Sequence, residues 1–443
     1  MRYSKVFVLL FIAGLWSILI ISLFQFSSNL REFKSFTRKR FRNELREVAE
    51  DRRSSGMTSI KRIVEKEDYY NVSIVPHGFY RNHVKVPKNR SREMSIFVYG
   101  GSSVVLPEEE DRTADFPGRL QKTIDQKVER NVSIYNFGRP ALTSTGVKNS
   151  INETIHLDPD LILVYTGHND YIRSTISFFD ILPNIFCERN ILWRVFGYVD
   201  GIIDKEGYEV YDKDMFLERE LLQLLTSLKI VEGEKIYHMR KMSEEIIRED
   251  LFKENIVSIE EISEEHNVPL VFSTVFSLQR PAMNDFIPLG FEDRKTGKQF
   301  YENISELEEK IDELDFSEGI RRLEKLERKA NRSPAPYRLR GKLYMREDEE
   351  VMAQKNFRKS LDLNIFRLDT RVHSSFNDVV RERKNISNTT VLDLHKELVR
   401  REDHPLLRED FFSSSIHLKS SESSDIVAES LFSLMEEKNI LPG

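Results

Sequence analysis

Short hydrophobic runs, each followed by small or polar residues, recur along the middle and the end of the chain. They lie at residues 95–99, 132–135, 161–166, 268–274 and 390–394. Runs of this length and composition are typical of strands that are buried on both faces of a parallel sheet. Residues 116–127 and 242–266, which lie between such runs, have the pattern of helices. The sequence therefore predicts an α/β fold in which a doubly wound parallel sheet forms the middle of three layers.

The amino terminus is a separate hydrophobic element. Residues 6–24 are uncharged and mostly apolar, and a helix of this length crosses a hydrocarbon core. The run is longer than the hydrophobic part of a typical signal peptide, and no small-x-small cleavage site follows it. We therefore expect a single-pass transmembrane anchor at residues 1–28. A buried core helix is the alternative.

Two signals disagree about the side of the membrane on which the rest of the chain lies. Seven basic residues between Arg31 and Arg46 favour the cytoplasm under the positive-inside rule. Eight Asn-x-Ser/Thr sequons, starting at Asn71, are acceptor sites for glycosylation outside the cytoplasm. We expect the chain after the anchor to be extracytoplasmic.

The remainder of the chain divides into segments of different composition. A charged stalk and linker is expected at residues 29–90, with a helical pattern up to residue 70. The α/β core is expected in three parts, at residues 91–175, 236–300 and 364–443. Two insertions separate these parts: an aromatic and apolar one at 176–235, which would form a lid or substrate wall, and a wholly helical one at 301–363.

The helical insertion has a recognisable pattern of its own. Residues 337–344 and 353–361 together resemble a single tetratricopeptide (TPR) unit. One such unit cannot form a solenoid, so we expect it to pack against the α/β core. It would serve either as a groove for a protein partner or simply as a helical insertion.

Composition argues against several classes of protein. The 443 residues are 40% hydrophobic and carry a net charge of −6, without a long basic stripe. Nucleic acid is therefore not expected as a partner. Cys187 is the only cysteine, which excludes an intrachain disulfide and a site made of several thiolates. The sequence has no HExxH motif and no cluster of histidines, so we expect neither a metal nor a cofactor.

Four positions carry candidate chemistry. Ser102, Gly138 and Asn169 each follow a predicted strand, and His417 lies near the end of the chain. The carboxyl ends of parallel strands meet at one edge of a sheet, where such folds bind ligands. A histidine there would activate a serine hydroxyl by taking its proton. Taken singly, the same residues would be a turn glycine, a helix N-cap and a structural histidine.

Together these positions resemble the conserved blocks of the SGNH (GDSL-like) hydrolase superfamily. The matching segments are Gly100-Gly101-Ser102-Ser103, Asn136-Phe137-Gly138, Gly167-His168-Asn169-Asp170 and Ser415-Ile416-His417. The resemblance implies a flavodoxin-like three-layer fold with Ser102 as nucleophile and His417 as general base. It also implies an oxyanion hole made by the backbone N–H groups of Ser102 and Gly138 and by the Asn169 amide. An SGNH domain with an anchor and a TPR-like insertion resembles a group of membrane-bound proteins.

One position departs from the superfamily pattern. Its members usually carry Asp three residues before the histidine, where this chain has Ser414. The missing carboxylate would otherwise hold the imidazole tautomer and stabilise the imidazolium, and its loss costs on the order of 10⁴ in turnover when nothing replaces it. Ser414 itself, a backbone carbonyl, Asp410 or Asp403 would have to orient His417 instead.

These observations lead to two functional hypotheses. The first is a membrane-anchored serine esterase or O-acyltransferase that acts through an acyl-serine on an acylated saccharide, lipid or envelope component. The second is an inactive SGNH domain that binds a glycan or a protein. The serine at position 414, in place of the usual aspartate, supports this second hypothesis. A phosphate-binding loop at residues 100–103 is disfavoured, because the lysine of a P-loop is absent there.

Overall fold

The computed structural model describes most of the chain outside its amino terminus and the first insertion. The described residues are 58–76, 83–90, 93–105, 114–172, 233–279, 294–330, 332–364, 371–384, 386, 388–414 and 416–441, with the isolated residues 43, 45 and 47. The chain divides into two compact units, Met1–Val48 with Thr175–Ser243 and Ala49–Ser174 with Glu244–Gly443. The expected anchor and most of the insertion at 176–235 lie outside the described residues. Among those that are described, no helix is both long and apolar enough to span a membrane.

A five-stranded parallel sheet forms the centre of the second unit. Its strands, in chain order, are β4 (Glu93–Gly100), β5 (Asn131–Asn136), β6 (Leu161–Tyr165), β7 (Leu270–Ser273) and β8 (Thr389–Leu392). Their spatial order is β5-β4-β6-β7-β8, and every neighbouring pair is parallel. This is the flavodoxin-like order, in which the second strand, β5, lies on one side of the first, β4, and all later strands lie on the other side. The predicted doubly wound parallel sheet is confirmed.

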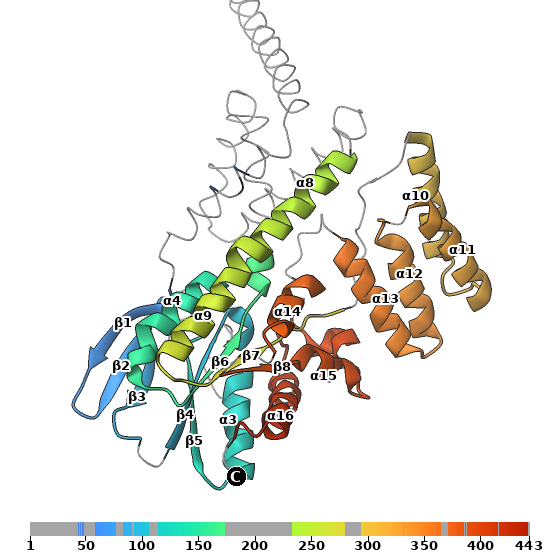
Figure 1. The fold of residues 1–443 in the computed structure, drawn as a ribbon. Coiled ribbons are helices and arrows are strands. Elements are labelled where there is room, and N and C mark those ends of the chain that lie inside the picture. Colours follow the sequence, from blue (N-terminus) through green and yellow to red (C-terminus); the bar gives the residue numbers. More distant parts are fainter. Residues whose placement is uncertain are drawn as a thin grey trace, which may run out of the picture. The chain divides into compact units, whose positions relative to one another are not determined.

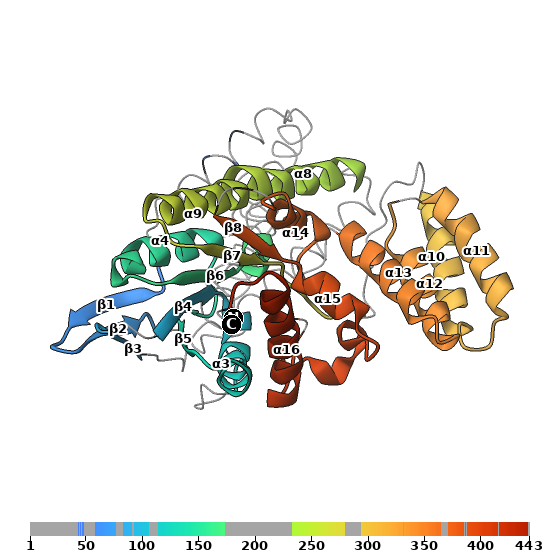
Figure 2. The same cartoon turned by 60° about the horizontal axis from the view of Figure 1, so that its bottom comes forward.

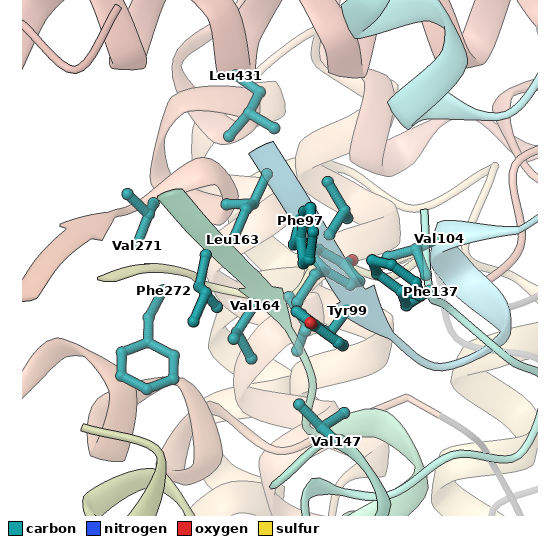
Figure 3. Close-up of a cluster of buried hydrophobic side chains, with 14 of the residues drawn as sticks. Phe97, Tyr99, Val104, Phe137, Val147, Leu163, Val164, Val271, Phe272 and Leu431 are labelled. Atoms are coloured by element: carbon teal, nitrogen blue, oxygen red, sulfur yellow. The ribbon is translucent and has the colours of Figure 1, made fainter. Parts of the chain in front are cut away.

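Helices cover both faces of this sheet. Helices α3 (Phe116–Lys127) and α16 (Ser421–Glu437) pack together on one face, and α4 (Ser144–Thr154) and α9 (Glu254–Glu265) pack together on the other (Figures 1 and 2). In Figure 3, Leu431 of α16 and Val147 of α4 lie on opposite sides of the strands. The three expected layers are therefore present.

The described residues contain further helices besides these four and those of the helical insertion. They are η1 (Ser102–Val104), η2 (Ile155–Leu157), α8 (Gly233–Ile246), the π-helix η4 (Ile247–Lys253), α14 (Ser374–Arg381), α15 (Leu394–Arg400), η5 (Pro405–Leu407) and η6 (Glu409–Phe411). The single helix expected at 242–266 is thus made of the end of α8, a π-helical stretch and α9.

Burial on both faces explains why β4 is so apolar. Ile96, Phe97, Val98 and Tyr99 are all fully buried. The Phe97 ring packs against the rings of Tyr135 and Phe137, and Tyr99 stacks on Phe137 at 5.4 Å between centroids (Figure 3). Each large apolar side chain buried in this way contributes about 1.5–3 kcal/mol. The core therefore holds the end of β4, and the turn after it, in place.

A second, antiparallel sheet lies where the sequence predicted helix and linker. It consists of β1 (Ile60–Glu65), β2 (Tyr69–Ile74) and β3 (His83–Pro87). The helical expectation up to residue 70 is wrong from residue 60 onward, because β1 pairs antiparallel with β2, for example Ile63 with Val72. In β3 the buried residues Val84 and Val86 alternate with exposed ones, the period of a strand. These side chains join the core of the main sheet. The backbone N–H and the hydroxyl of Ser59 also donate to Ser150 Oγ at 2.8 and 2.7 Å, which fastens the small sheet to α4.

The helical insertion consists of α10 (Arg294–Glu309), α11 (Phe316–Lys329), α12 (Ala335–Arg346) and α13 (Glu350–Leu363). The first three helices share an apolar cluster of their own. Arg338, 1% exposed, forms an ion pair with Glu308 at 2.5 Å across that cluster. Helix α13 joins the α/β core, because Phe357 shares an apolar cluster with Leu407 and Arg358 Nη2 donates to the carbonyl of Val372 at 2.9 Å. The resemblance to a TPR unit stays a prediction.

Candidate active site

Ser102 lies at the carboxyl end of the central strand β4. The strand ends at Gly100 and η1 begins at Ser102, so the turn between them consists of Gly101 alone. A Cβ on Gly101 would lie only 2.5 Å from Asn169 Nδ2, so a larger residue would push the asparagine away. Ser102 is 9% exposed. The glycine therefore allows the serine and the asparagine to share one end of the sheet.

His417 contacts the serine from a loop 315 positions later in the chain. Its Nε2 atom lies 2.7 Å from Ser102 Oγ. The loop is a narrow hairpin, in which Phe412 pairs with Leu418 and the Ser413 N–H donates to the His417 carbonyl at 2.8 Å. These bonds fix the backbone on both sides of the histidine, so that its ring is presented to Ser102.

Ser414 occupies the other side of the His417 ring. Its Oγ lies 2.9 Å from Nδ1, and it also accepts the backbone N–H of His417 at 3.3 Å. When Nδ1–H donates to Ser414, Nε2 carries the lone pair that can accept the proton of Ser102. The three side chains form a continuous chain of hydrogen bonds, with a neutral hydroxyl where an acidic residue would add charge.

The two acidic candidates for orienting His417 are paired with arginines instead. Asp410 forms an ion pair with Arg408 at 2.9 Å and is 64% exposed, and the hydrogen bond from Arg408 lowers the pKa of its carboxyl. Asp403 forms an ion pair with Arg401 at 2.9 Å. The structure therefore places Ser414, and neither aspartate, on Nδ1.

Asn169 follows β6 and faces the same turn. Its Nδ2 donates to the Leu142 carbonyl at 2.8 Å. A primary amide has two hydrogens, so the second can be directed to a substrate oxygen. The adjacent Asp170 is buried and accepts the backbone N–H of Ser144 at 3.0 Å, which caps the start of α4. The N-cap role considered for this segment thus falls to Asp170, on a helix that lies earlier in the chain.

Gly138 follows β5 and packs directly against Val104 of η1. Its N–H, an expected oxyanion donor, donates to Asn136 Oδ1 at 2.9 Å. Asn136 Nδ2 in turn donates to the Val104 carbonyl at 2.8 Å and lies 3.2 Å from Asp115 Oδ2. The glycine is therefore next to the serine turn, with its N–H directed to a side chain of its own segment.

Sequence reasoning gave no role to Asn136, which it named only as part of the Gly138 block, and it did not name Asp115. Asn136 stabilises η1 by donating its amide to the Val104 carbonyl, and Asp115 accepts a hydrogen bond from the same amide. Asp115 is also the N-cap of α3, where it accepts the Gly118 N–H at 2.8 Å. The sequence signal for Asn136 was an asparagine in the last position of a buried strand. Nothing in the local sequence distinguishes Asp115 from an ordinary N-cap residue.

Aromatic rings pack between the end of β6 and the histidine loop. The rings of Phe116 and Phe276 lie 5.6 and 5.7 Å from that of Tyr165, and Phe412 of the histidine loop lies 6.3 Å from Phe276. The Tyr165 hydroxyl accepts the Phe276 N–H at 3.1 Å, and burial raises the pKa of the tyrosine. His168 is buried beside the same ring. Tyr165, Phe276 and Phe412 thus form one packed aromatic cluster that connects the end of β6 with the histidine loop.

The described residues contain no group of three or more histidine, cysteine, aspartate or glutamate side chains that could hold a metal ion.

The sheet order and the contact across the ends of its strands define a class of protein. A serine after β4, an asparagine after β6 and a histidine just before α16 meet at the carboxyl edge of a flavodoxin-like sheet. The chain has a flavodoxin-like α/β fold, and the three residues lie where the resemblance to SGNH-type (GDSL-like) hydrolases leads one to expect them.

Comparisons with known proteins show distant structural similarity only. No family model and no curated protein matches the chain. A lipase from a goat rumen metagenome is 12% identical with a TM-score of 0.31, over 77% of this chain and 97% of that one. A lipase/acylhydrolase from Enterococcus faecalis is 12% identical with a TM-score of 0.33, over 78% of this chain and 96% of that one. TesA is 8% identical with a TM-score of 0.32, over 78% of this chain and 99% of that one. At these TM-scores the similarities add nothing to what the sheet and the site show by themselves.

Proposed function

We propose that the chain is an SGNH-type serine esterase or O-acyltransferase that forms an acyl-serine on Ser102. The observation that carries the proposal is the 2.7 Å contact between Ser102 Oγ and His417 Nε2, with Ser414 on the far side of the ring. A nucleophile bonded to a base that is itself oriented by a third group is the arrangement that activates a serine hydroxyl.

The reaction would proceed in two steps at this contact. Ser102 Oγ attacks the acyl carbon of an ester while His417 Nε2 takes its proton, and the bond to the alcohol oxygen then breaks as His417 returns that proton to the alcohol. Water or a second hydroxyl next attacks the acyl-serine with the same base. The second Asn169 amide hydrogen would bind the oxyanion in both steps.

The substrate and the location complete the proposal. We propose an acylated saccharide, lipid or envelope component as substrate, with residues 6–24 as a membrane anchor and the hydrolase outside the cytoplasm. Protease added to sealed vesicles of native orientation should digest the chain after residue 30. Protection until the vesicles are lysed would place the hydrolase in the cytoplasm. The helices at 301–363 are the proposed surface for a protein partner.

Labelling with a neutral fluorophosphonate tests the nucleophile. The full-length protein should be labelled at Ser102, and the label should disappear in Ser102→Ala and largely in His417→Ala, because only an activated hydroxyl reacts. Ser103→Ala, which changes the adjacent serine, is the matched control and should label like the wild type. A folded wild-type protein that takes no label would support the alternative, an inactive domain that binds a glycan or a protein; the uncharged Ser414 favours that alternative.

A further inference from the structure

The direction of the Asn169 amide depends on the carbonyl of Leu142. That carbonyl accepts one of the two amide hydrogens at 2.8 Å, which leaves the other for a substrate oxygen. Leu142 ends a turn in which its N–H donates to the Arg139 carbonyl at 3.3 Å and in which Ala141 has a φ of 61°. The left-handed region is unfavourable for a residue with a Cβ, and it persists only where surrounding contacts hold it. The turn that carries the Leu142 carbonyl therefore needs support from another part of the chain.

Asp170 supplies this support at Ser144, two residues after Leu142. Its carboxylate, which is 3% exposed, accepts the Ser144 N–H at 3.0 Å and the Ser144 hydroxyl at 2.6 Å. Asn255 of α9, also buried, donates to the same hydroxyl at 2.9 Å. Asn169 and Asp170 are neighbours in the chain, so their side chains hold one segment at two points. The amide and its acceptor thus belong to a closed ring of bonds.

A contrast with other helices shows that capping alone does not require Asp170. Helices α3, α11, α15 and α16 are each capped by the side chain that directly precedes them, namely Asp115, Asp315, Asp393 and Ser420. Thr143 holds that position before α4, and threonine is a good capping residue, yet its buried hydroxyl has no hydrogen-bond partner among the described residues. The cap comes instead from Asp170, 26 positions after Ser144. A carboxylate from a distant segment therefore does more than cap: it ties the start of α4 to the Asn169 segment.

We propose that Asp170 is a positioning residue for the reaction at Ser102. Its bonds to Ser144 keep the Leu142 carbonyl in place, and that carbonyl keeps the second hydrogen of the Asn169 amide directed to the oxyanion. This inference rests on the proposed acyl-serine function, in which the asparagine binds the oxyanion. Removal of Asp170 would lower kcat through the asparagine, because the amide acts on the transition state and not on the bound ester.

Steady-state kinetics of the full-length protein with p-nitrophenyl acetate test this role. Asp170→Ala should lower kcat by about tenfold to hundredfold with KM within about twofold of the wild type, because a displacement of about 1 Å at a reacting centre can cost a hundredfold. Asp170→Asn, which keeps an oxygen for the N–H and the hydroxyl of Ser144, should restore most of that loss. Asp393→Ala is the matched control: it removes the capping carboxylate of α15 and should lower the Tm without changing kcat.

A double-mutant cycle distinguishes positioning from a general loss of structure. In the Asn169→Ala background, which has no amide to direct, Asp170→Ala should change kcat by less than about twofold. Losses that multiply in the double variant, or a wild-type kcat in Asp170→Ala, would overturn the inference. If Asp170→Ala does not fold, Ser144→Ala carries the test. It removes only the hydroxyl bond, so kcat should fall by about threefold to tenfold, and an unchanged kcat would count against the positioning role.

Hydrogen exchange of the Asn169 side chain separates this inference from the proposed function. With isotope-labelled asparagine, its NMR signals are identified by their absence in Asn169→Ala. Exchange of the hydrogen bonded to Leu142 should be slow in the wild type, fast in Asp170→Ala and slow in Asp393→Ala. Protection that depends on Asp170 in a protein without turnover or label would support the positioning role while the acyl-serine function fails. Protection that survives in Asp170→Ala would overturn the positioning role, and turnover by the wild type would show that the function stands.

Discussion

The two sides of Ser102 are built differently. On the base side, His417 and Ser414 lie in a hairpin loop and already form a chain of hydrogen bonds of 2.7 and 2.9 Å to the serine. On the donor side, Gly138 and Asn169 lie at strand ends, where the Gly138 N–H donates to Asn136 and the Asn169 amide to Leu142. The base is therefore assembled in the free chain, whereas the Gly138 N–H and one of the two Asn169 amide hydrogens are bonded to the protein's own acceptors.

This difference shows that the free chain is better arranged for proton transfer than for binding of the oxyanion. Proton transfer from Ser102 to His417 needs no rearrangement. Binding of an oxyanion by the Gly138 N–H requires that group to leave Asn136, while Asn169 has one amide hydrogen to offer where it stands. Donors in a free enzyme often become aligned only when substrate binds. The comparison predicts that the base side carries the larger part of the rate enhancement.

Removal of the base should give the largest effect. His417→Ala leaves Ser102 without a proton acceptor, and we expect kcat/KM for an activated acetyl ester to fall by about 10⁵–10⁶. Free imidazole should restore part of this activity, because the cavity left by the side chain admits a base. His404→Ala, which removes a histidine paired with Glu350, is the control and should keep its activity. A loss below about a hundredfold in His417→Ala would mean that another group deprotonates the serine.

Removal of the Asn169 donor should cost less than removal of the base. Asn169→Ala should lower kcat by about 10²–10³ with little change in KM, because the amide binds the oxyanion and not the ground-state ester. The ratio of the His417 loss to the Asn169 loss measures the asymmetry directly. A larger loss for Asn169→Ala than for His417→Ala would reverse the comparison. A rise in KM at constant kcat would give the asparagine a role in substrate binding only.

The two sides also differ in how far sequence alone could predict them. The five strands and most helices follow from hydrophobic runs and periodicity, because burial on both faces of the sheet demands those patterns. The meeting of Ser102 and His417 is likewise expected from the ends of the strands and the order of the blocks. The direction of the Gly138 N–H could not be predicted, since it depends on the side-chain rotamer of Asn136. The small sheet β1-β2-β3 was missed because its strands are short and charged, and because buried and exposed side chains do not alternate along β1.

Variants of Ser414 measure how much the hydrogen bond to His417 Nδ1 contributes to activity on the base side. Ser414→Ala removes the hydrogen bond to Nδ1, and we expect kcat/KM to fall by about tenfold. Ser414→Asp should raise it by about tenfold, because a carboxylate on Nδ1 also stabilises the imidazolium. Ser413→Ala, which changes a hydroxyl that bonds the Leu418 carbonyl in the same hairpin, is the control and should have a smaller effect. Equal activity in all three variants would mean that the backbone of the hairpin alone orients the ring.

Asp410 should have the smallest effect, although it is the nearest acidic residue before Ser414 in the sequence. Its carboxylate is exposed and paired with Arg408, whose hydrogen bond lowers the pKa of Asp410, so it stays ionised across the pH range of the assay. A group that stays ionised cannot produce the loss of activity expected as pH falls, which belongs to protonation of the His417 base. Asp410→Asn should therefore leave kcat/KM within about twofold of the wild type and leave its acid limb in place when measured from about pH 5 to 9. A tenfold loss, or a shifted acid limb, would show that Asp410 leaves Arg408 during turnover and supplies the charge that Ser414 lacks.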